Sequence, residues 1–207
     1  MSLLLLIRHA LADGTGKKLT GWTPGVHLSR SGARQAEALA GRLESLPVAA
    51  VYSSPLERCL ETARPLAASK GLRIRSSKDL GEVDYGEWTG RPLSRLSKTK
   101  LWRTVQTHPA TARFPGGESL LEVQQRATNE AERIAGAHPN ELVVLVTHGD
   151  VIRLLLAHFA GVHTDLFQRI IVGPASVSAV AVGNEVPRIL RTNDMGDLAD
   201  LAGPRKR

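Results

Sequence analysis

Short apolar runs alternate along the chain with segments whose apolar residues recur at helical spacing. Strands are predicted at 3–7, 48–52, 72–76, 141–146, 176–182 and 187–193. Helices are predicted at 29–46, 54–70, 119–137 and 150–161, with one short helix expected around 93–107. The run at 3–7 is apolar without a break, as is typical of a strand buried on both faces. The alternation of strands and helices predicts an α/β domain with a mostly parallel sheet.

Two helix starts carry capping patterns. Ser54 is predicted to be an N-cap, with Glu57 completing a capping box three residues later. Ser119 is predicted to cap another helix, with a second capping box through Glu122. Pro65 lies within the helix that begins near Ser54, and it is expected to kink or divide that helix.

The chain of 207 residues contains no low-complexity linker, so residues 1–195 are expected to form a single domain. Residues 196–207, which end in the basic PRKR, are expected to be a flexible tail. No apolar run approaches the roughly 18 residues of a membrane span, and the run at 3–7 is too short for a signal peptide. With a single cysteine, Cys59, the chain has no internal disulfide, so we expect a cytoplasmic protein. Cys59 itself is interpreted as a core residue.

The formal net charge is +7, which favours anionic partners such as nucleic acid, lipid headgroups or phosphorylated molecules. The basic residues are spread along the chain, however, and aromatic residues make up only 4%. A surface on which bases could stack is therefore not expected. We expect neither nucleic acid nor a membrane as partner, but a small phosphorylated metabolite.

Polar and basic residues follow three of the predicted strands, at the edge where open α/β sheets bind ligands. The residues in question are Arg8 and His9 after the first strand, Ser53, Ser54 and Arg58 after the second, and Thr147, His148 and Gly149 after the fourth. A crevice with two histidines and two arginines is cationic and suits a phosphate group. A single arginine at such a place is more often a surface residue and a single histidine more often structural, but the coincidence of Arg8, His9, Arg58 and His148 favours a site. Arg58 adds to this, because a cation in the first turn of a helix opposes the helix dipole unless an anion lies nearby.

Five segments resemble, in order, the motifs of the histidine phosphatase superfamily, the phosphoglycerate mutase-like proteins. They are LLLLIRHA, VYSSPLERCLETA, DLGEVDYGEWTG, FPGGES and VLVTHGDVIRLLL. The resemblance implies a three-layer α/β/α sandwich and a mechanism through phosphohistidine. GEWTGRPLSRL resembles the phosphatase branch of the superfamily rather than the mutases.

The resemblance also implies roles for individual residues. His9 would take the phosphoryl group, Arg8, Arg58 and His148 would surround its oxygens, and Glu82 would be the proton donor. Gly149 would contribute to substrate binding. By spacing alone, Asp79, Asp84 and Glu87 are equally good candidates for the acid. No metal or other cofactor is expected, since the chain has no clustered ligand spacing.

The chain departs from its family after the first histidine, where Ala10, Leu11 and Ala12 replace the usual Gly-Glu-Thr or Gly-Glu-Ser. The methyl group of Ala10 is expected to restrict the approach of the backbone to phosphate.

We expect a metal-independent phosphomonoesterase. One alternative is a 2,3-bisphosphoglycerate-dependent phosphoglycerate mutase or another phosphomutase. A second is a catalytically impaired protein that binds anionic ligands through its basic surface. A homodimer is only the default expectation.

Overall fold

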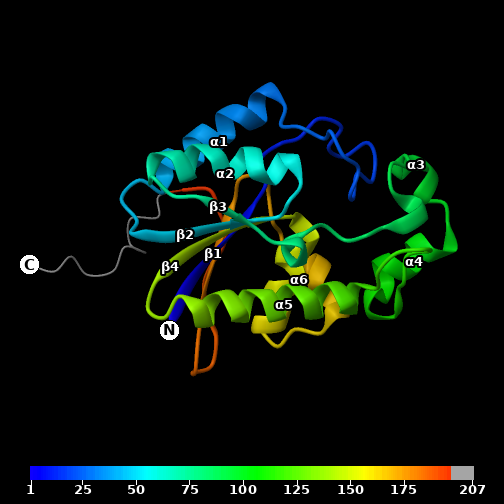
Figure 1. Ribbon diagram of the computed structural model, residues 1–207. Coiled ribbons are helices and arrows are strands. Elements are labelled where there is room, and N and C mark those ends of the chain that lie inside the picture. The colour runs from blue at the N-terminus through cyan, green and yellow to red at the C-terminus, as the bar shows by residue number, and fades with distance from the viewer. Residues whose placement is uncertain (197–207) are drawn as a thin grey trace, which may run out of the picture.

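The computed structural model describes residues 1–196, so the predicted tail lies outside the described residues apart from Gly196. Its centre is a six-stranded sheet with the order β3-β2-β4-β1-β5-β6 (Figure 1). The strands are β1 (Ser2–Arg8), β2 (Val48–Ser53), β3 (Ile74–Ser76), β4 (Leu142–Thr147), β5 (Val177–Val182) and β6 (Arg188–Asp194). β3, β2, β4 and β1 are parallel, β5 pairs antiparallel with β1, and β6 pairs antiparallel with β5. The predicted strands and the mostly parallel sheet are confirmed.

Helices cover both faces of the sheet, which makes three layers (Figure 1). The α-helices are α1 (Arg30–Arg42), α2 (Glu57–Ser69), α3 (Leu93–Leu96), α4 (Lys100–Thr107), α5 (Leu120–Ala137) and α6 (Gly149–Phe159). Short 3₁₀ helices span Lys78–Leu80, Gly86–Trp88, Pro109–Thr111 and Thr164–Arg169. The α1 and α2 helices lie on one face, and α5 and α6 lie on the other, with α3 and α4 beyond the N-terminal end of α5. The predicted α/β/α sandwich is confirmed.

The unbroken apolar character of β1 follows from its place in the middle layer. Leu5 and Ile7 belong to the core on the α1 and α2 side, whereas Leu4 and Leu6 belong to the core on the α5 and α6 side. Alternate residues of a strand point to opposite faces. When helices cover both faces, every residue of the strand therefore points into apolar core.

One predicted capping box is present and the other is wrong. The Ser119 side chain accepts from the amide of Glu122, and the Glu122 side chain accepts from the amide of Ser119. Leu56, not Ser54, is the N-cap of α2, and it makes no side-chain capping bond. The hydroxyl of Ser54 accepts from the amide of Leu56 at 3.4 Å and lies 2.8 Å from Nε2 of His148, so it bonds the residue before the helix and a distant partner instead of the first turn of α2.

Two further expectations about helices need correction. α2 continues through Pro65 instead of dividing there, and Ala63, Leu66 and Ala67 around it are buried against the sheet. That packing holds the helix together despite the missing backbone hydrogen bond. The region around 93–107 contains two helices rather than one, because Thr99 caps α4 by accepting from the amide of Trp102.

Candidate active site

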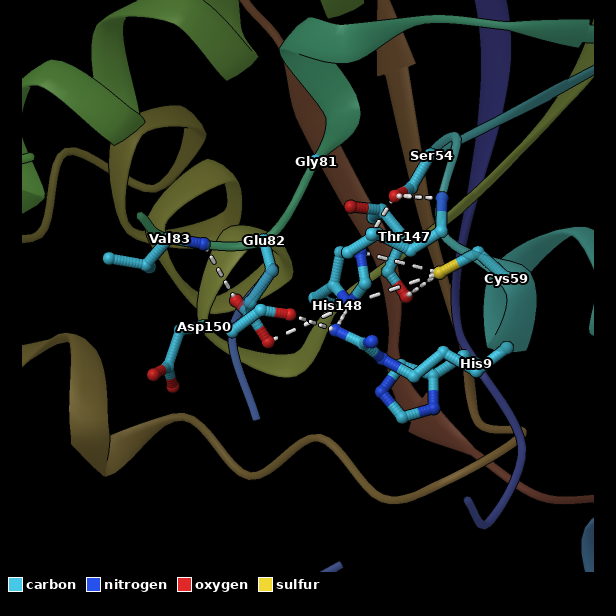
Figure 2. A network of polar contacts seen from close by, with 12 residues as sticks. His9, Ser54, Cys59, Gly81, Glu82, Val83, Thr147, His148 and Asp150 are labelled. Carbon is cyan, nitrogen blue, oxygen red and sulfur yellow. Dashed lines mark hydrogen bonds and ion pairs between the residues drawn. The ribbon is translucent and has the colours of Figure 1, made fainter. Parts of the chain in front are cut away.

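The two histidines that follow β1 and β4 lie side by side. The parallel register pairs Arg8 with Thr147, so His9 and His148 leave neighbouring strands at the same edge of the sheet. Their ring centroids are 5.3 Å apart, and the rings are inclined at 63°. Figure 2 shows the pair, with Glu82 on the other side of His148. His9 and His148 thus lie close together at the strand ends, as predicted from the sequence.

His9 presents one ring nitrogen as a free base. Its Nδ1 lies 2.8 Å from the carbonyl oxygen of Ala10, which can only accept, so Nδ1 carries the hydrogen and Nε2 the lone pair. Burial and the neighbouring charge of Arg58 lower the pKa of His9 to about 3. The imidazole is therefore neutral at ordinary pH. The amide of Ala10 donates to Oγ1 of Thr62, which fixes the turn that carries the histidine.

His148 is fully buried and its ring is held from both ends. Nδ1 accepts from Nη2 of Arg58 at 3.2 Å, because a guanidinium can only donate, and Nε2 then donates to Oγ of Ser54. Burial, followed by the charge of Arg58, lowers its pKa well below the usual range. Cys59 Sγ lies 3.4 Å from the Nε2 atom. Burial raises the pKa of Cys59 to about 12, so this core cysteine stays a thiol.

The arginines at the site are only partly satisfied within the protein. Arg8 donates through Nη1 to the carbonyl of Val172 at 2.7 Å, and Arg58 donates through Nη2 to the carbonyl of Gly21 at 2.9 Å. Nε of Arg8, together with Nε and Nη1 of Arg58, is buried without a hydrogen-bond partner among the described residues. Buried donors without partners are rare in folded proteins. Their concentration here fits a site that accepts a multivalent oxyanion.

Glu82 is the acidic side chain that reaches the histidines. Its Oε2 lies 3.6 Å from Nδ1 of His148, and its Oε1 accepts from the amide of Val83 at 3.0 Å. Burial and the negative charge of Asp150 raise the pKa of Glu82 to about 7. The other candidates of the acidic segment, Asp79, Asp84 and Glu87, are exposed. The geometry separates four carboxylates that spacing alone left equivalent.

Two side chains that the sequence did not single out, those of Trp22 and Arg126, hydrogen-bond the main chain of the segment that carries Glu82. The indole of Trp22 donates to the carbonyl of Glu82 at 2.6 Å. Arg126 of α5 donates to the carbonyls of Gly81 and Glu82, both at 2.9 Å, and it also forms an ion pair of 2.7 Å with Glu118. An arginine in an amphipathic helix resembles any solvated surface residue in the sequence, so no local signal marks Arg126.

The residue after each histidine has a different environment. Gly149 begins α6. A Cβ atom at this position would lie only 3.2 Å from Nε of Arg8, so the absence of a side chain leaves room for the guanidinium. Ala10 is fully buried in a small cluster with Ala36 and Ala175. The methyl group by which Ala10 departs from the family pattern is therefore packed against these two residues. The predicted effect of Ala10 on phosphate binding stays a prediction.

The remaining histidines lie outside the site, and Ser119 of the PGGES segment caps α5. His27, His108, His158 and His163 are exposed, and His138 packs against Tyr52 while bonding Glu141.

Among residues 1–196, no group of three or more His, Cys, Asp or Glu side chains is arranged to hold a metal ion. No helix within the same range is long and apolar enough to cross a membrane.

Comparison with known protein families gives a match over almost the whole described chain. The family described as histidine phosphatase superfamily (branch 1) matches residues 4–195. Phosphoserine phosphatase 1 of Hydrogenobacter thermophilus is 29% identical over 200 residues, which cover 92% of this chain and 91% of that protein. Phosphoglycerate mutase-like protein 4 of Arabidopsis thaliana is 32% identical over 157 residues, 73% of this chain and 68% of that protein.

Solved structures share the fold closely. YhfR of Bacillus stearothermophilus superposes with a TM-score of 0.89 at 26% identity, over 95% of this chain and 98% of that one. A mycobacterial glucosyl-3-phosphoglycerate phosphatase superposes with a TM-score of 0.83 at 26% identity, over 92% of this chain and 98% of that one.

Proposed function

The chain belongs to the histidine phosphatase superfamily (branch 1), and from this membership we propose that it hydrolyses a small phosphomonoester through a phosphohistidine on His9. The observation that carries the proposal is the neutral imidazole of His9, whose Nε2 is free beside the unpartnered donors of Arg8 and Arg58. A nucleophile needs its lone pair, and the developing charge on phosphorus needs donors already in place.

In the first step, Nε2 of His9 attacks phosphorus in line with the ester oxygen. The N–P bond forms as the P–O bond to the leaving alcohol breaks, and Glu82 gives its proton to that oxygen. A carboxyl group with a pKa of about 7 holds this proton at neutral pH. Arg8, Arg58 and His148 surround the transferred oxygens, and α6 directs its N-terminus, at Gly149, toward the same anion.

In the second step, Glu82 is a carboxylate and takes a proton from water. The water oxygen attacks the phosphoryl group, the N–P bond breaks, and inorganic phosphate leaves while His9 regains its neutral form. Each step leaves Glu82 in the protonation state that the next one requires. The chemistry that this proposal assigns needs no metal or organic cofactor.

The test is a rapid quench of the enzyme after mixing with ³²P-labelled p-nitrophenyl phosphate. We expect acid-labile, alkali-stable label on the wild-type protein and none on His9→Ala. His158→Ala removes an exposed histidine outside the site and should retain the label. Undiminished turnover in His9→Ala would refute the proposal.

A parallel assay separates the alternatives. Conversion of 3- to 2-phosphoglycerate that depends on added 2,3-bisphosphoglycerate, and that exceeds hydrolysis, would identify a mutase using the same histidine. Absence of both reactions, together with steeply salt-dependent binding to nucleic acid, would support a protein that only binds anions.

A further inference from the structure

An aromatic pocket of about 440 Å³ lies beside the candidate active site. We define it by its five aromatic lining residues, Tyr85, Trp88, Trp102, Phe114 and Phe167. The chain has three Trp, two Tyr and three Phe, so most of its few aromatic side chains meet at this one place. They come from the segment after Glu82, from α4, from the turn before α5 and from the 3₁₀ helix after α6.

The rings of the aromatic pocket support one another. Trp88 stacks on Trp102 with ring centroids 6.3 Å apart, and it meets Phe114 edge to face at 5.4 Å. Tyr85 also meets Phe114 edge to face, with ring centroids 4.9 Å apart. Trp88, Phe114 and Phe167 are buried, whereas Trp102 is half-buried. The buried rings are therefore held in place by packing.

A cluster of aromatic residues is most often simply core. This space is a surface pocket, however, and its volume falls in the range of small-molecule sites. The pocket is distinguished from other depressions of the surface by its aromatic lining and by its place next to Glu82.

The aromatic pocket adjoins the reacting groups through Asp150 and Tyr85. Asp150 comes two residues after His148, lines the pocket and lies next to Glu82 (Figure 2). The hydroxyl of Tyr85, three residues after Glu82, donates to Oδ2 of Asp150 at 3.1 Å. An alcohol whose oxygen takes a proton from Glu82 would extend toward this side.

The charges at the pocket are already matched. Arg153 and Asp150 line it and pair with each other at 2.9 Å, and Nε of Arg153 donates to the carbonyl of Ile170. Among the described residues that line the pocket, these two are the charged ones. A second anionic group on a substrate would have to compete with Asp150 for Arg153, whereas an apolar group would find aromatic walls.

We propose that the aromatic pocket binds the alcohol part of the substrate, and that this part is a neutral aromatic or alkyl group. The proposal rests on the phosphatase function proposed above. It predicts selectivity for phosphomonoesters of apolar alcohols over those whose alcohol carries a carboxylate.

The first experiment compares kcat/KM for 2-phenylethyl phosphate, ethyl phosphate and phosphoserine. The first two release primary alkoxides of similar basicity, so a difference between them reports binding of the phenyl group and not the demand for acid catalysis. We expect roughly a tenfold or greater advantage for 2-phenylethyl phosphate over both others. Equal values, or a preference for phosphoserine, would overturn the pocket proposal while leaving the phosphatase proposal intact.

Two variants of α4 localise the effect. Gln106→Trp adds bulk at an exposed residue that lines the pocket, and Arg103→Trp adds the same bulk at an exposed residue that does not. We expect Gln106→Trp to remove most of the advantage of 2-phenylethyl phosphate without changing kcat/KM for ethyl phosphate, and Arg103→Trp to retain it. Equal behaviour of the two variants would contradict this location.

A binding measurement keeps the two proposals separable. 2-Phenylethylphosphonate and ethylphosphonate cannot be hydrolysed, and their binding can be followed through the tryptophan fluorescence of the wild-type protein. Tighter binding of the phenyl compound without turnover of any ester would support the pocket and refute the phosphatase proposal. Equal binding would refute the pocket whatever the turnover.

Discussion

The guanidinium of Arg126 on α5 donates to the main-chain carbonyl of Glu82 at 2.9 Å. It holds the same segment through the carbonyls of Asp79 and Gly81, and Glu118 binds its other edge. The carboxyl that is proposed to act as the acid is thus placed by a residue more than 40 positions later in the chain, which does not itself line the space between the histidines.

Replacing Arg126 by Met should therefore weaken catalysis through position alone. We expect kcat/KM for ethyl phosphate to fall roughly 10- to 100-fold, because small displacements of a catalytic group are costly. The loss should be much smaller for p-nitrophenyl phosphate, whose leaving group needs no proton. This contrast between substrates distinguishes a positioning role from general destabilisation. Arg113→Met removes an arginine that pairs with Glu122 at the surface, and it should leave kcat/KM unchanged for both substrates.

Glu82→Gln should show the same contrast more strongly. An amide cannot protonate an alkoxide, so we expect kcat/KM for ethyl phosphate to fall about 10²- to 10⁴-fold, and that for p-nitrophenyl phosphate to fall far less. Glu87→Gln, which removes an exposed carboxylate of the same segment, serves as the matched control. An equal loss for both esters would argue against Glu82 as the proton donor.

Glu82→Gln should also change how stability depends on pH. Burial and Asp150 raise the pKa of Glu82 to about 7 in the folded state, against about 4.3 for an exposed glutamate. Between these values the folded protein retains a proton that the unfolded chain has lost, so the contribution of Glu82 to stability falls as pH rises. Above pH 7 its ionised side chain costs about 3 kcal/mol.

Glutamine does not titrate, and the variant escapes this cost. Its free energy of unfolding relative to wild type should therefore rise by about 3 kcal/mol from pH 4 to pH 8, measured by urea denaturation. Unfolding curves whose difference is the same at both pH values would contradict the raised pKa.

The residues after the two histidines should respond in opposite ways. Gly149→Ala places a Cβ atom 3.2 Å from Nε of Arg8, and we expect kcat/KM to fall about tenfold with little loss of stability. Ala10→Gly removes a buried methyl group from the cluster with Ala36 and Ala175. It should lower the free energy of unfolding by about 1–2 kcal/mol. Because this methyl group is predicted to restrict phosphate binding, kcat/KM should rise in the variant, and an unchanged kcat/KM would contradict that prediction.

The layers and the meeting of the histidines could be predicted from sequence because both follow from local patterns. An apolar run without alternation requires cover on both faces, and parallel strands bring their ends to one edge. Arg58 at the start of α2 opposes the helix dipole, yet a single arginine there is more often a solvated surface residue. Its coincidence with Arg8, His9 and His148 at the strand ends is what favours a site.

The rest depends on contacts between distant segments. Ser54 has the sequence of a helix cap, but its hydroxyl bonds His148, 94 residues away. Spacing leaves Glu82 equivalent to its acidic neighbours, and only the family resemblance singles it out. Its burial beside Asp150 and His148, which raises its pKa, is a property of the fold that spacing does not report. The aromatic pocket combines residues of several loops and short helices, each of which looks unremarkable by itself.

The order of strands in the sheet has a consequence for how the protein is made. β1 is synthesised long before both of its partners in the sheet, β4 and β5. Contacts over such separations form slowly and leave the unpaired edges of β1 open in the meantime. The nascent chain therefore carries His9 through most of its synthesis without the strand that delivers His148. Activity should appear abruptly, only once the segment up to Val182 has joined the sheet.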